Sequence, residues 1–239
     1  MTTTPDREIL GIVYPPSFEP EGLPAYARAA ERAGVEELWL WEDCFREGGV
    51  ATVAAALAVT ERIRVAIGVF PMPLRNIAMV AMETASLVRM FPGRFVLGIG
   101  HGVQRWMEQI GARAASPLTL MREYVPALRA LLAGEEVTVS GRYINLDKVK
   151  LDWPPTEEIE ILIGGEGPKT LVVTGELGDG TIFVPGISPK VIAEAAVRID
   201  EGRVNAGRTS PRRISVFIMT VFADTPEGLE QGRAWFQEE

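Results

Sequence analysis

Short β-branched runs alternate with longer helical stretches along nearly the whole chain, and this alternation limits the possible folds more than any other feature. The strand-like runs are almost continuously apolar, as in "RFVLGIG" at 94–100, which is typical of parallel strands covered on both faces by right-handed helical crossovers. The sequence therefore predicts an α/β fold. We expect strands at 7–16, 35–45, 62–73, 94–100, 159–165, 180–186 and 212–224, and helices at 20–34, 48–60, 76–93, 116–133, 168–177, 189–205 and from Thr225.

The alternation is interrupted once, after the fourth expected strand. Residues 134–156 alternate in polarity on either side of Ser140-Gly141, which predicts a β-hairpin insertion and not a separate domain. We therefore expect one barrel-sized domain over 1–239. An eight-stranded barrel needs one more strand–helix unit than this chain supplies, so either the chain is a fragment or the barrel is completed unusually.

Charge and rare residues exclude several functions. A net charge of −8 with no basic run argues against binding to nucleic acids or anionic membranes. The single cysteine excludes an internal disulfide or a thiolate zinc site, and no pair of histidines is spaced for a metal. The first residues show no export signal, so we expect a cytoplasmic protein without a metal centre.

Three candidate catalytic residues follow predicted strands, where parallel α/β folds place their chemistry. Asp43 ends the second strand and is interpreted as a ligand-orienting or proton-accepting carboxylate, with a helix N-cap before "REGG" as the alternative. Cys44 beside it is either a nucleophile or a small buried thiol. His101, the only histidine, follows the fourth strand, where it either exchanges a proton or simply hydrogen-bonds a carbonyl group.

Two glycine-rich turns follow the fourth and fifth strands. "GIGHGV" at 98–103 lacks the third glycine of a dinucleotide fingerprint, and "GGEGPKT" at 164–170 has the wrong spacing for a nucleoside-triphosphate loop. The second turn still precedes a predicted helix, where bare backbone N–H groups suit one phosphate. A plain β–α turn is the alternative.

With these segments together, the chain resembles the luciferase-like flavin-dependent oxidoreductases, and within them the branch that uses the deazaflavin coenzyme F420. The resemblance runs from Ile9 to about Ala223 and rests on "RFVLGIGHG" (94–102), "AIGVFPMPLRN" (66–76) and "ILIGGEGPKT" (161–170) with "GDG" (178–180). It implies a TIM-like (β/α)8 barrel with the hairpin after strand 4, in this chain without a recognisable eighth unit. It also implies a homodimer.

The resemblance further implies roles for individual positions. A cis peptide at Gly68-Val69 is expected to back the cofactor ring, and Asp43 to lie near the reacting atoms. Several relatives have histidine where this chain has Cys44, so His101 is a candidate substitute for proton transfer. The expected cofactor-binding residues are Gly68, Val69, Gly100, His101, Gly102 and Trp106, although Trp106 replaces a polar residue, with Gly164, Gly165, Glu166 and Gly167 around the phosphate.

These observations lead to one functional hypothesis and two alternatives. The first is an oxidoreductase that moves a hydride between coenzyme F420 and a small organic substrate, since the ring carries the hydride and the site is poor in activated nucleophiles. The second is a monooxygenase that uses flavin mononucleotide (FMN) and oxygen. The third is a non-catalytic flavin-binding protein.

Overall fold

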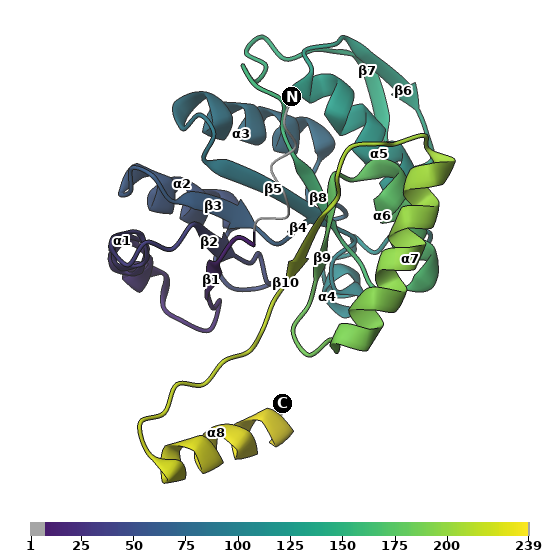
Figure 1. Cartoon of the computed structure of the whole chain (residues 1–239). Helices are drawn as coiled ribbons and strands as arrows, with labels where there is room; N and C mark the ends of the chain where they lie inside the picture. The colour runs from purple at the N-terminus through teal and green to yellow at the C-terminus, as the bar shows by residue number, and fades with distance from the viewer. Residues whose placement is uncertain (1–7, 239) are drawn as a thin grey trace.

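The computed structural model describes residues 8–238 and has the predicted α/β architecture, with helices around a curled parallel sheet (Figure 1). The first position of the strand expected at 7–16, and the residues before it, lie outside the described part. The sheet strands are β1 (Gly11–Tyr14), β2 (Glu37–Leu40), β3 (Arg64–Ile67), β4 (Phe70–Pro71), β5 (Phe95–Gly100), β8 (Ile161–Gly164), β9 (Gly180–Phe183) and β10 (Arg213–Val216).

Most of the helices cover the outside of the sheet, whereas the last one, α8 (Pro226–Glu238), lies apart from it, and a separate antiparallel pair forms the predicted hairpin (Figure 1). The pair is β6 (Val137–Ser140) and β7 (Asn145–Val149). Within the described residues, no helix is both long and apolar enough to cross a membrane. The helices are η1 (Pro20–Gly22), α1 (Leu23–Arg32), α2 (Gly49–Ala58), α3 (Ile77–Met90), α4 (Gln104–Gln109), α5 (Pro117–Leu132), α6 (Pro168–Leu177), α7 (Pro189–Asn205) and α8 (Pro226–Glu238).

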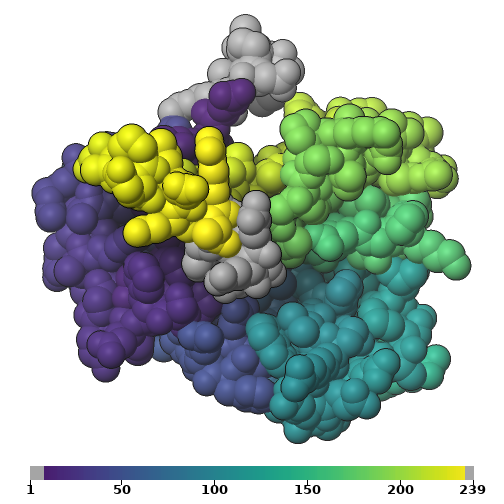
Figure 2. Space-filling model, turned by 90° about the horizontal axis from the view of Figure 1, so that it is seen from below, coloured from purple at the N-terminus to yellow at the C-terminus, as the bar shows by residue number. Residues whose placement is uncertain are grey.

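The parallel strands follow one another in chain order, β1-β2-β3-β5-β8-β9-β10, with the short β4 paired to β5. Figure 2 shows the successive parts of the chain arranged around the molecule in the same order, from purple through teal to green. Within residues 8–238, β1 and β10 each pair with one neighbour only. The sheet is therefore a curled, open path.

Side chains connect β10, the last strand of this path, to β2, the neighbour of its first strand. Arg213 of β10 forms an ion pair with Glu37 of β2, whose side chain is buried. The ring of Phe217, just after β10, meets that of Trp39 edge-on with 5.2 Å between centroids. These contacts join β10 to β2 beside a small apolar interior. That interior consists of Trp39, Ala66, Val96, Leu162 and Ile182.

Candidate active site

The two glycine-rich turns lie side by side at the same rim of the sheet. In the register of β5 and β8, Gly100 is opposite Gly164, so the turns that follow these glycines leave neighbouring strands at the same level. Pro71 of β4 is also paired with Gly100. Parallel strands place all these carboxyl ends on one side of the sheet, as a ligand site in this class of fold requires.

The Gly68-Val69 peptide bond is cis, which confirms the prediction made from the resemblance. It lies between β3 and β4, so the strand expected over 62–73 is in fact two strands. A second non-proline cis bond, Cys44-Phe45, was not predicted.

The Val69 side chain explains two of the predicted glycines. A Cβ atom placed on Gly100 would lie 2.8 Å from one Val69 methyl group, and a Cβ on Gly164 would lie 3.1 Å from the other. Both positions must therefore stay small for Val69 to pack between the ends of β5 and β8. Val69 is partly exposed and packs on the interior apolar cluster, so it covers this cluster at the carboxyl ends of the strands.

His101 hydrogen-bonds a carbonyl group, as one of its two interpretations expected. Its Nδ1 lies 3.0 Å from the carbonyl oxygen of Gly102. A carbonyl oxygen only accepts, so Nδ1 donates and the neutral ring keeps Nε2 as an acceptor. The Gln104 side chain donates to the carbonyl groups of His101 (3.2 Å) and Gly102 (3.3 Å) and fixes the turn. A role in proton exchange through Nε2 stays a prediction.

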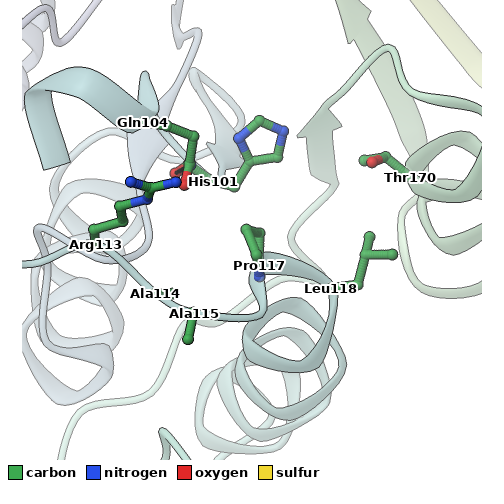
Figure 3. Close-up of a pocket in the computed structure, with 8 residues that line it drawn as sticks. All are labelled: His101, Gln104, Arg113, Ala114, Ala115, Pro117, Leu118 and Thr170. Carbon is green, nitrogen blue, oxygen red and sulfur yellow. Dashed lines mark hydrogen bonds between the residues drawn. The ribbon is translucent and has the colours of Figure 1, made fainter. Parts of the chain in front are cut away.

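A cavity of about 580 Å³ joins the two turns (Figure 3). His101 contributes from the turn after β5, and Thr170 from the first turn of α6 on the other side. Of the ten residues expected to bind the cofactor, only His101 is part of the lining, and Trp106 and Glu166 are among those that are not. The lining residues are His101, Gln104, Arg113, Ala114, Ala115, Pro117, Leu118 and Thr170.

The start of α6 fits an anionic group. Its N-cap, Gly167, has no side-chain capping bond, and Pro168 occupies the first helical position. A Cβ on Gly165 would lie 2.4 Å from the Thr170 methyl group, so this glycine allows the turn to fold closely over Thr170. The N–H groups of the first helical turn have no partners inside the helix and carry its positive dipole end. This donor set suits a phosphate.

The carboxylate at the end of β2 is not a helix cap. α2 begins at Gly49 with Gly48 as its N-cap, and the Gly49 N–H donates to Glu42 Oε1 at 2.9 Å. The N-cap alternative for Asp43 is therefore wrong, because Glu42 occupies the end of the helix instead. Asp43 contributes its carbonyl oxygen, which accepts from Arg46 N at 2.9 Å.

Burial changes the protonation of both residues at the end of β2. It raises the pKa of the Asp43 carboxyl, while Arg46 opposes this rise and Glu47 adds to it. Burial also raises the pKa of the Cys44 thiol, and the carboxylates of Glu42 and Asp43 raise it further. A neutral thiol is a poor nucleophile, which favours the small-thiol interpretation of Cys44. Asp43 with a raised pKa is better suited to exchange a proton near neutral pH.

The substitution Asp43→Asn tests this environment. The pKa of the Asp43 carboxyl is higher in the folded protein than in the unfolded chain. Ionisation of this carboxyl therefore destabilises the folded state, and stability is lost as the pH rises from the pKa in the unfolded chain through the pKa in the folded protein. We expect the variant to have the higher free energy of unfolding at about pH 7 and no advantage at about pH 3. Urea denaturation at both pH values measures this. The control Asp152→Asn, at an exposed carboxyl, should stay within about 0.5 kcal/mol of the unchanged protein. A variant less stable at neutral pH contradicts the assignment.

Two features near the site were not predicted from the sequence. Glu42 accepts hydrogen bonds from Arg75, which also pairs with Glu83 at 2.7 Å. Arg113 lies in a segment with no expected element and reaches the cavity. Among residues 8–238 there is no group of three or more histidine, cysteine or acidic side chains that could hold a metal.

The chain is similar to known proteins in sequence and in fold. The family model for the luciferase-like monooxygenases matches residues 4–237. A 5,10-methylenetetrahydromethanopterin reductase from Methanolobus tindarius is 30% identical over 213 residues, which cover 89% of this chain and 64% of the reductase. The chain thus spans less than two thirds of that relative's length.

Two solved structures have the same fold. An F420-dependent secondary alcohol dehydrogenase, in complex with an F420-acetone adduct, superimposes with a TM-score of 0.84 at 25% identity, over 95% of this chain and 74% of the other. The FMN complex of the oxygenating constituent of 3,6-diketocamphane monooxygenase from Pseudomonas putida gives 0.77 at 20% identity, over 96% and 71%. The second likeness concerns the fold alone.

Proposed function

Because this chain belongs to the luciferase-like monooxygenase family, we propose that it is an oxidoreductase that transfers a hydride between coenzyme F420 and a small organic substrate. The sequence relative from Methanolobus tindarius is a reductase, and the alcohol dehydrogenase of the same fold is F420-dependent. The proposal extends this chemistry to a chain that spans only part of the relatives' length.

One structural observation carries the proposal. The register of β5 and β8 brings both glycine-rich turns to one rim, and the cavity between them has Thr170, in the first turn of α6, on one side. The flat ring of the cofactor would lie on Val69, and its anionic tail would extend from there along the two glycine-rich turns. The site has small residues where a bulky planar ligand must approach the backbone.

The chain's own residues would bind and orient. The deazaflavin ring, when bound, supplies the hydride chemistry. Val69 would support the ring, and the first turn of α6 would hold the phosphate. Asp43, with its raised pKa, would hold or release the proton that accompanies hydride transfer to a carbonyl or imine carbon. His101 Nε2 would give one directional contact at the edge of the cavity.

Two alternatives use the same rim. An FMN-dependent monooxygenase is supported by the family and by the FMN-containing neighbour of the same fold, and the start of α6 would take a phosphate monoester equally well. A non-catalytic flavin-binding protein would need the two glycine-rich turns to bind the cofactor, but it would not need Asp43 for proton transfer.

Fluorescence titration with each cofactor tests the ranking. We expect coenzyme F420 to bind at least about tenfold more tightly than FMN, and reduced F420 to be oxidised when a suitable carbonyl or imine substrate is added. Tight FMN binding without F420 binding would overturn the proposal. F420 binding without turnover on a broad substrate panel would favour the carrier alternative.

We also propose a homodimer in the cytoplasm. Met79, Met82 and Met90 on α3 are each more than half exposed, and the neighbouring α2 has no charged residue. The exposed methionine side chains of α3 suit contact with a second copy of this chain. Cys44 is unpaired, which is consistent with a reducing compartment. Analytical ultracentrifugation at micromolar concentration tests the dimer.

A further inference from the structure

The cavity between the two turns extends well beyond the start of α6, and its far side has a distinct chemistry. Figure 3 shows Arg113 and Gln104 across the cavity from Thr170. Arg113 is the one permanently charged residue of the lining, and no carboxylate lines the cavity. In a chain of net charge −8, a pocket walled by an arginine, an amide, an imidazole and a hydroxyl group is suited to a second anionic group.

Arg113 is free to change partners. Its present partner is Glu108 of α4, with 3.3 Å between Arg113 Nη1 and Glu108 Oε1. Both side chains are more than half exposed, at 53% and 67%. Exposed pairs of this kind are weak, so exchange of the glutamate for a ligand carboxylate costs little. The guanidinium fork also matches a carboxylate with two parallel hydrogen bonds.

The chain on either side of Arg113 fixes the wall. Ala114 is buried, and Pro117 begins α5, so the backbone of the segment is anchored close to the guanidinium. The Ser116 N–H donates to Tyr143 Oη at 2.7 Å, which ties the segment to the end of the hairpin. The Arg113 side chain itself is more than half exposed. The wall is therefore preformed and its charged group is adaptable, which reduces the ordering cost of binding.

We propose that this cavity is a tail subsite, in which Arg113 binds a carboxylate that lies beyond the cofactor's phosphate. The inference rests on the proposed function. The side chain of a deazaflavin coenzyme continues past its phosphodiester into carboxylate-bearing units, whereas FMN ends in a phosphate monoester. If the phosphate binds at the first turn of α6, the carboxylate-bearing units beyond it would occupy the Arg113 side of the cavity. The subsite selects for coenzyme F420 by charge and length.

Binding of three ligands to three variants tests the subsite. The ligands are coenzyme F420, a deazaflavin truncated after the phosphate, and FMN, each followed by fluorescence titration. Arg113→Gln should weaken F420 binding about tenfold and leave the two shorter ligands within about twofold. Arg105→Gln, at an exposed arginine of α4 outside the cavity lining, is the matched control and should change none of them.

Glu108→Gln should change the affinity for coenzyme F420 in the opposite direction. Removing the competing carboxylate frees Arg113, so F420 should bind about two- to threefold more tightly, again with no change for the truncated ligand. Equal weakening of all three ligands by Arg113→Gln, or no weakening at all, overturns the subsite. If the unchanged protein binds the truncated deazaflavin and F420 equally, the subsite fails while the proposed function stands. If it binds neither, the proposed function fails and the subsite with it.

Discussion

Replacing Arg75 with methionine is expected to lower the free energy of unfolding by about 3–5 kcal/mol. Arg75 forms two hydrogen bonds with Glu42, one of them at 2.6 Å from Nε, and its guanidinium lies 4.2 Å from the centre of the Phe70 ring. The two paired side chains are only 13% and 6% exposed. Without Arg75, Glu42 keeps a buried negative charge with no cation beside it, and this is the costly state. Urea denaturation followed by circular dichroism measures the change.

Two controls separate the buried charge from loss of packing. Arg122→Met breaks the ion pair with Glu176, but Arg122 is half exposed, so we expect a loss of at most about 1 kcal/mol. The double variant Glu42→Met with Arg75→Met should recover much of the stability, because the more deeply buried charge of Glu42 is removed too and the other partner of Arg75, Glu83, is 25% exposed. A double variant no more stable than Arg75→Met alone would show that the charge is not the cause.

Replacing Gly202 with valine is expected to destabilise the protein by about 3 kcal/mol and to disturb the proposed phosphate-binding turn as well. α6 and α7 cross closely, since a Cβ on Gly202 would lie 1.9 Å from the Val172 carbonyl oxygen. The contact is reciprocal, with a Cβ on Gly175 only 2.0 Å from the Ile199 carbonyl oxygen. A side chain at either glycine must push backbone against backbone, and rotamer changes cannot relieve this.

Urea denaturation and cofactor titration report the two effects of Gly202→Val. The first turn of α6 carries Thr170, so displacement of the helix should weaken cofactor binding at the proposed phosphate site in parallel with the loss of stability. Gly48→Ser is the control, because a Cβ there has nothing within 4 Å and serine is a good helix N-cap. It should stay within about 0.5 kcal/mol of the unchanged protein. A fully stable Gly202→Val variant with unchanged cofactor affinity contradicts the packing argument.

Local signals in the sequence predict the helices well where they are strong. The bounds 168–177 and 189–205 agree with α6 and α7, because a proline begins each helix and a glycine follows closely after its end. The six-residue α4 was missed because only Met107 of that segment is buried, which is too few apolar positions to show a helical period.

The candidate site was predicted in part. Strand ends located both glycine-rich turns, because the carboxyl ends of parallel strands share one rim. Periodicity did not reveal the contact of Glu42 with Arg75, 33 residues away, since only the folded sheet brings these residues together. For the same reason Asp43, and not Glu42, was considered as the cap of α2. Arg113 had no signal, because a single exposed arginine in a loop is ordinary until a cavity is found beside it.

The packing of Val69 between Gly100 and Gly164 also offers a route to redesign. The contacts that require both glycines come from the two methyl groups of one side chain. Shortening Val69 to alanine therefore opens room beside two strands at once without removing a main-chain hydrogen bond. The enlarged cavity beside Val69→Ala would accommodate bulkier compounds. Either Gly100 or Gly164 would then tolerate replacement by alanine.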